Sequence, residues 1–191
     1  KASPAFQFKL AHKIPELRQQ GFPLLDTYEK PTRHEIITAW AIQTERLLVE
    51  ETNLDSLWAQ RVAQMLSGHH GAWQPYQSIT NVPDSERGGE EWAAARRGLG
   101  RELKAIFAPP DCNPQLRALE QNSLLTILSG FISVADWLGS DEELFPYCDE
   151  FMPLADYSRK SEKQARDGLQ QRGWLFALTA PEPFDFARLF M

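Results

Sequence analysis

Cysteine is scarce in this chain of 191 residues, which contains only Cys112 and Cys148. Two cysteines provide neither a disulfide framework nor a four-ligand zinc site, so we interpret them as small packed side chains. No apolar run reaches the length of about 18 residues that a membrane-spanning helix needs. The alternating polarity of strands, internal repeats and a glycine-rich phosphate loop are also missing. We therefore expect a cytoplasmic protein built from helices, with no membrane partner.

Positive charge is also in short supply. The 20 Lys and Arg residues are outnumbered by 26 Asp and Glu residues, and the formal net charge is −6. This excludes a protein that coats nucleic acid by charge alone, but it does not exclude a nuclease whose bound metal ions supply positive charge locally. Two basic clusters are candidates for phosphate contact, although a solvated helix face is the favoured interpretation of each. They are Arg96, Arg97, Arg101 and Lys104, and Arg159, Lys160, Lys163 and Arg166.

Apolar residues make up 42% of the chain, which is enough for one well-packed domain. Their spacing predicts an all-α bundle of about six to eight helices. The predicted helices cover about residues 5–12, 32–48, 55–67, 90–108, 114–137 and 157–178, and the third of them starts at Asn53 or Asp55. Residues 71–90 are predicted to form an exposed loop. Residues 1–180 would form the domain, and residues 181–191 would begin a linker.

Two helix starts carry the pattern of a capping box, in which a hydroxyl residue precedes a Glu by three positions. Thr32 with Glu35 is the first, and Ser140 with Glu143 is the second. The first of these pairs assigns the carboxylate of Glu35 to the backbone at the beginning of its helix.

The most informative motif is Gly68-His69-His70-Gly71, which holds two of the four histidines of the chain. Two adjacent neutral imidazoles can converge on one divalent cation, and flanking glycines allow the backbone and solvent to approach closely. A surface loop is the alternative interpretation of such a pair. The motif is predicted to follow the end of a helix, where glycine commonly stands.

Two further residues fit a metal site. His34 lies in the predicted first turn of a helix, where the helix dipole disfavours the imidazolium form and keeps the ring neutral for ligation. Asp136 follows the apolar stretch 124–135, and a buried carboxylate is costly unless a cation or several donors satisfy it. The alternatives are a core or surface histidine and a helix-terminal aspartate that reaches solvent.

Trp73 and Tyr76 follow the histidine pair and are candidates for stacking on unpaired bases. Core packing or anchoring of the loop is the favoured alternative for both aromatic side chains.

Taken together, these motifs resemble a known family. The motif at residues 68–71, followed by Leu-Ser-Gly-Phe-Ile-Ser-Val-Ala-Asp-Trp-Leu-Gly-Ser at residues 128–140, resembles the HD nuclease domain of the CRISPR-associated nuclease–helicase of type I interference systems. The opening Lys-Ala-Ser-Pro-Ala-Phe-Gln is similar to the segment that starts with the lysine of the family's H-D-x-G-K motif. The closing residues 184–190 are similar to the stretch that leads into the helicase, so the resemblance covers nearly the whole chain.

The resemblance implies an all-α, HD-domain-like helical bundle that cleaves single-stranded DNA in a metal-dependent reaction. The implied cofactor is one or two divalent ions, with manganese, iron, cobalt or nickel expected and magnesium possible. The implied partners are single-stranded DNA, a helicase domain in cis or in trans, and a guide-RNA surveillance complex. By position, His34, His69 and His70 would bind one metal ion and Asp136 would help to hold the other. Lys1 would be a catalytic residue beside the site.

By the same resemblance, Ser140 would lie near the substrate, although capping of a helix is the favoured role. The family's remaining ligands, an early histidine and the His-Asp of H-D-x-G-K, precede the lysine and do not occur in residues 1–191. We therefore expect an N-terminally truncated domain that is inactive or impaired as it stands. A nucleotide phosphohydrolase of the HD type and a non-catalytic helical docking module are the alternative functions.

Overall fold

The computed structural model describes residues 2–7, 13–25, 31–52, 54–110, 118–146, 148 and 152–175. This part of the chain is all-helical and contains no strand, as predicted. The helices are α1 (Pro4–Gln7), α2 (Ile14–Gln19), α3 (His34–Thr44), α4 (Leu47–Thr52), α5 (Ser56–Leu66), α6 (Tyr76–Thr80), α7 (Asp84–Arg87), α8 (Glu90–Phe107), α9 (Ala118–Gly139) and α10 (Leu154–Gln171). The chain divides into two compact units, residues 1–136 and 137–191.

Short helices explain why the described residues hold more helices than the expected six to eight. Two of them, α6 and α7, lie in the stretch 71–90 that was predicted to be an exposed loop. Most of the stretch is exposed, as predicted, but it is not a plain loop, because it forms two short helices and because Ile79 and Val82 anchor it in the core, with 0% and 4% of their surface exposed. The prolines and glycines interrupt the helices there without removing them.

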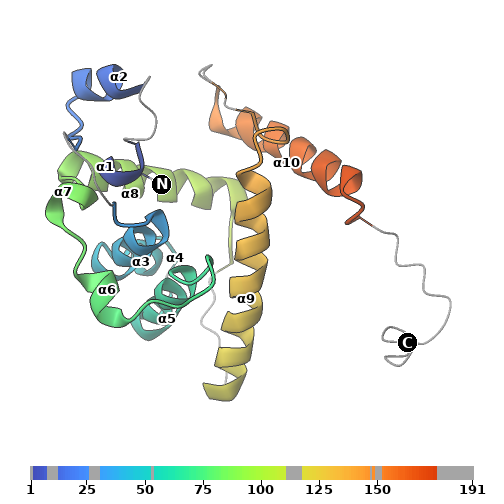
Figure 1. The fold of residues 1–191 in the computed structure, drawn as a ribbon, viewed down its shortest axis with the longest axis horizontal. Helices are drawn as coiled ribbons and strands as arrows, with labels where there is room; N and C mark the ends of the chain where they lie inside the picture. Colours follow the sequence, from blue (N-terminus) through green and yellow to red (C-terminus); the bar gives the residue numbers. More distant parts are fainter. Residues whose placement is uncertain are drawn as a thin grey trace. The chain divides into compact units, whose positions relative to one another are not determined.

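Helix α3 lies at the centre of the first unit and contacts α5, α6 and α4 (Figure 1). Ala39 on α3 and Ala63 on α5 are completely buried. Small side chains at a helix contact allow the two axes to approach closely, which brings the ends of the two helices together. The core around this contact includes Ile37, Trp40 and Ile42.

Local signals set the bounds of the long helices. The side chain of Asp55 caps α5 by accepting hydrogen bonds from the backbone N–H groups of Leu57 and Trp58, at 2.9 and 3.4 Å. Helix α8 ends before Pro109, and its C-cap, Ala108, adopts a left-handed conformation. A proline disfavours the helical conformation of the residue before it, so this helix ends where the sequence predicts.

The first predicted capping box is absent. Helix α3 begins after Arg33, and no side chain caps it. The backbone N–H of Thr32 donates instead to Glu86 Oε2 at 2.6 Å. The side chain of Glu35 turns into the interior, where it is 1% exposed. The prediction failed because the distant Glu86 binds the Thr32 backbone and the Glu35 side chain turns away from the start of the helix.

Arg96 on α8 is a structural residue, so its assignment to a solvated or phosphate-binding helix face is wrong. Its guanidinium is 7% exposed and forms two hydrogen bonds with Glu45, including one of 2.8 Å from Nε to Oε2. Its Nη1 also donates to the carbonyl oxygens of Ala2 and Arg87, at 2.9 and 2.8 Å. Arg96 thus joins α8 to the end of α3 and to the first described residues of the chain.

The second unit contains α10, which packs on the segment that follows α9. Gln164 donates a hydrogen bond to the Leu144 carbonyl at 3.1 Å, and Leu144 lies directly against Gly168. Residues 142–144 form a turn in which Glu143 N–H donates to Asp141 Oδ1 at 3.0 Å. The second predicted capping box is therefore also wrong. The predicted linker, residues 181–191, lies outside the described residues, and no described helix has the length and apolarity needed to cross a membrane.

Candidate metal centre

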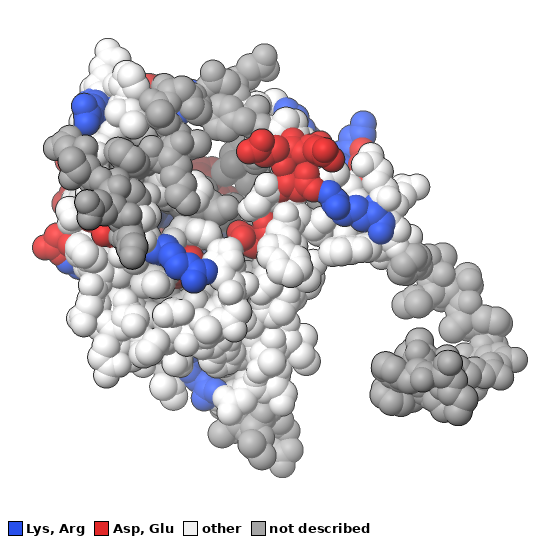
Figure 2. Space-filling view, viewed as in Figure 1, with Lys and Arg blue, Asp and Glu red and all other residues white. Residues whose placement is uncertain are grey.

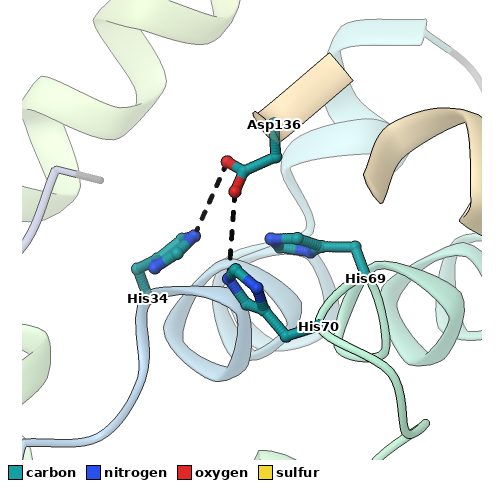
Figure 3. A group of neighbouring side chains, drawn as sticks. All are labelled: His34, His69, His70 and Asp136. Carbon is teal, nitrogen blue, oxygen red and sulfur yellow. Dashed lines mark ion pairs between the residues drawn. The ribbon is translucent and has the colours of Figure 1, made fainter. Parts of the chain in front are cut away.

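The four residues that the sequence predicts as metal ligands come together in the first unit. His34 is the first residue of α3, His69 and His70 lie in the turn after α5, and Asp136 lies in the last turn of α9. One ligand atom from each side chain lies within 4.8 Å of all the others. Figure 3 shows the three imidazole rings and the carboxylate pointing toward one another from α3, from the turn after α5 and from α9.

Asp136 faces two of the imidazoles. Its Oδ1 lies 4.0 Å from His34 Nε2, and its Oδ2 lies 3.9 Å from His70 Nε2 (Figure 3). Residues 125, 129, 133 and 136 follow helical spacing, so α9 turns one face toward the core and the histidines. The opposite side of the helix is open, with Ile127 and Phe131 each 70% exposed. The apolar stretch 124–135 is thus buried on one side of its helix only.

The orientation of His69 is fixed by the helix that precedes it. Its Nδ1 lies 2.7 Å from the carbonyl oxygen of Leu66, and this contact requires a proton on Nδ1. The lone pair is then on Nε2, which is buried and has no hydrogen-bond partner in the described part of the chain. A buried acceptor without a partner is costly, and a cation would satisfy it.

Three imidazoles and one carboxylate are a suitable donor set for a divalent transition metal. Such an ion would have His34, His69, His70 and Asp136 as its ligands, since all four ligand atoms are mutually close. The donor set suits magnesium less well, because magnesium prefers oxygen ligands. The residues present therefore fit the predicted kind of cofactor.

Helix α9 also anchors the loop that carries the histidine pair. Ser133 Oγ lies within hydrogen-bonding distance of the His69 carbonyl at 2.6 Å and of the Ser129 carbonyl at 2.9 Å. The indole N–H of Trp73 donates to Ser129 Oγ at 3.3 Å. The backbone of His69 is thereby tied to the same helix that supplies Asp136.

The two glycines that flank the histidines have different physical roles. Gly71 has a φ of +117°, in the region that side chains disfavour. Gly68 instead lies under the indole of Trp73, and a Cβ there would come within 2.1 Å of Trp73 Cδ1 and 3.0 Å of its Cα. The ring covers the glycine only because position 68 has no side chain.

We expect Gly68→Ala to destabilise the chain by about 1–3 kcal/mol, the usual cost of overpacking, because the Trp73 backbone and ring must both move. Gly130→Ala is the matched control, because a Cβ at that helical position meets no atom within 4 Å. The control should leave stability unchanged or raise it by up to about 1 kcal/mol. Chemical unfolding measures both, and equal stabilities for the two variants would contradict the prediction.

The structure gives less direct support for the other predicted site residues. Trp73 is 38% exposed and bonds to Ser129, which is an anchoring contact, so stacking on bases stays a prediction. Tyr76 is 57% exposed and lines a pocket to which none of the four predicted ligands contributes. Ser140 is exposed and belongs to the second unit, and Lys1 lies outside the described residues.

Sequence reasoning missed one residue near the centre. Glu35 Oε2 lies 3.6 Å from His34 Nδ1 and 3.9 Å from His70 Nε2. The available signal was its helical face, since Glu35 shares the spacing i, i+4, i+7 with the buried Ala39 and Ile42. The capping pattern obscured that signal, because a Glu at this position is ordinarily assigned to the helix terminus.

Comparison with known proteins agrees with this geometry. The family model described as "Cas3, HD domain" matches residues 1–145. The "CRISPR-associated endonuclease/helicase Cas3" of Thermus thermophilus is 27% identical over 195 residues, an alignment that covers all of this chain and 20% of that protein. A solved structure titled "Crystal structure of CRISPR-associated protein" has a TM-score of 0.79 and 28% identity, and the match covers all of this chain and 21% of that one. The chain thus spans about a fifth of these relatives, and it belongs to the Cas3 HD-domain family.

Proposed function

We propose that residues 1–191 form the metal-dependent nuclease part of a type I CRISPR interference protein and that the substrate is single-stranded DNA. The observation that carries this proposal is the convergence of His34, His69, His70 and Asp136 within 4.8 Å. The Thermus relative is named an endonuclease/helicase, which supports the same class of reaction, the cleavage of nucleic acid. A helicase domain in cis or in trans and a guide-RNA complex are the partners that we propose.

We also propose that one ion of manganese, iron, cobalt or nickel is shared by all four side chains. Their mutual distances favour a shared ion over the separation of Asp136 from the three histidines that the resemblance implies. When bound, a divalent cation supplies Lewis-acid activation of water and neutralises charge on the scissile phosphate. The protein contributes preorganisation: Leu66 holds the His69 ring, and Ser133 holds the His69 backbone.

Phosphate attraction is expected to depend on this centre and not on a basic surface. On the face shown in Figure 2, the Lys and Arg side chains of the described residues are scattered and form no broad patch. Arg96, the most buried member of one predicted basic cluster, already forms an ion pair with Glu45. A divalent ion held by three neutral imidazoles and one ligating carboxylate would attract the phosphate oxygens of the DNA backbone directly.

We further propose that these 191 residues alone cleave DNA slowly. The resemblance implies a further histidine and a His-Asp pair as ligands, and neither is present in residues 1–191. The four side chains at the centre supply three imidazoles and only one carboxylate. A phosphodiesterase that uses two ions needs more oxygen ligands than this.

The test is manganese-dependent cleavage of circular single-stranded DNA by the natural full-length protein, with residues 1–191 assayed beside it. Asp136→Asn should lower the rate by at least about 10–100-fold, because the variant loses the anionic ligand of the proposed ion and binds the metal more weakly. Phosphate release from nucleotides without DNA cleavage would replace the proposal with a nucleotide phosphohydrolase. Metal binding and cleavage both absent from the full-length protein would favour a docking module.

A further inference from the structure

We propose that Glu35 is a positioning residue of this metal centre, which holds the ring of His34 and balances the charge of the bound cation. The inference rests on the proposed function, because it concerns the same site. Glu35 lies on α3 beside His34, and its side chain reaches the gap between His34 and His70.

Hydrogen bonds to neighbouring residues do not explain why the side chain of Glu35 is buried. The side chain is 1% exposed, and neither carboxylate oxygen has a hydrogen bond in the described part of the chain. Glu35 forms an ion pair with Arg33, whose Nε lies 2.5 Å from Glu35 Oε1, but the Arg33 side chain is 55% exposed. A buried carboxylate is stable only when its charge is compensated nearby.

Glu45 shows what a structural carboxylate in this fold looks like. It is 10% exposed and receives two hydrogen bonds from the buried guanidinium of Arg96. Bidentate pairing of this kind compensates a buried carboxylate fully. Glu35 has no equivalent partner among the described residues, and its Oε2 faces imidazoles instead. The contrast indicates a role for Glu35 at the metal centre.

The geometry around His34 explains what that role is. Glu35 Oε2 lies 3.6 Å from His34 Nδ1, and Asp136 Oδ1 lies 4.0 Å from His34 Nε2. The negative charge of Glu35 favours the tautomer with the proton on Nδ1, which leaves the Nε2 lone pair directed at the centre. The Leu66 carbonyl does the same for His69 at 2.7 Å. A carboxylate behind a ligating histidine is a common outer partner in metal sites.

Charge balance supports the same role. Two carboxylates, Glu35 and Asp136, match the two positive charges of a divalent ion held by neutral imidazoles. A cavity of about 330 Å³ opens beside Glu35, and its lining includes Arg33, His34, Glu35 and His70.

The test is titration of the 191-residue chain with Co²⁺ by calorimetry, together with the melting temperature without metal. Glu35→Gln should weaken Co²⁺ binding by about 10–100-fold, the usual cost of losing an outer partner. The metal-free melting temperature should stay the same or rise, because the variant removes a buried charge. Glu45→Gln is the matched control, and it should lower the melting temperature and leave Co²⁺ affinity unchanged.

The outcomes separate this inference from the proposed function. A natural chain that binds no Co²⁺ would overturn the proposed function and this inference with it. Strong binding by both the natural chain and Glu35→Gln would overturn the role of Glu35 alone. If Glu35→Gln does not fold, Glu35→Asp replaces it. The shorter aspartate keeps the negative charge but places it farther from His34, so the affinity for Co²⁺ should fall by about 10-fold. An unchanged affinity for Co²⁺ would overturn the inference.

Discussion

Replacing His69 by Ala is expected to weaken the binding of Co²⁺ or Mn²⁺ by more than about 100-fold, the upper range for outer partners, because a direct ligand is lost. His69 is the most buried of the three histidines, with 9% of its surface exposed. Its Nε2 is oriented by the bond from Nδ1 to the Leu66 carbonyl, so the substitution removes a donor that is already held in place. Metal-dependent DNA cleavage by the full-length protein should be lost to the same extent. Calorimetry and a cleavage assay measure the two effects.

Two controls make the His69 prediction specific. The metal-free melting temperature shows whether the loop still folds, and the anchor from Ser133 to the residue 69 carbonyl does not depend on the imidazole. Gln60→Ala, an exposed change on α5, should alter neither metal affinity nor cleavage. Unchanged affinity in His69→Ala would show that the three imidazoles do not share an ion and would remove the basis of the proposed function.

Replacing Arg96 by Ala is expected to cost about 3–5 kcal/mol of the free energy of unfolding, the usual effect of removing one partner from a buried ion pair. The substitution leaves the buried carboxylate of Glu45 without its two hydrogen bonds. It also leaves the carbonyl oxygens of Ala2 and Arg87 without their donor. The guanidinium lies 5.6 Å from the ring centre of Trp40, so a cation–π contact is lost as well.

Arg97→Ala is the matched control for Arg96. Arg97 is the next residue on the same helix, and its ion pair with Glu90 spans 3.4 Å between side chains that are 35% and 89% exposed. Exposed pairs of this kind contribute less than about 1 kcal/mol. Chemical unfolding should therefore separate the two variants clearly. A double variant that replaces both Arg96 and Glu45 by Met should recover part of the stability lost in Arg96→Ala, because it leaves no unpaired charge.

Local chemistry explains which parts of the fold could be predicted. The start of α5 at Asp55 and the end of α8 before Pro109 depend on a side-chain cap and on a proline. Both act over three or four residues, so they are visible in the sequence. The failures arose where distant residues compete for the same groups. Thr32 is bonded to Glu86, which is 54 positions away, and a local pattern cannot reveal such a partner.

For the candidate site, the chemical identity of its donors was visible in the sequence, and their convergence was not. A pair of histidines between glycines and an aspartate after an apolar stretch are unusual enough to indicate a metal site before any coordinates. The inward turn of Glu35, the burial of Arg96 and the convergence of residues 34, 69, 70 and 136 depend on how α3, α5, α8 and α9 pack. Donor type is a property of single residues, whereas distance and burial are properties of the packed helices, and only the tertiary structure determines them.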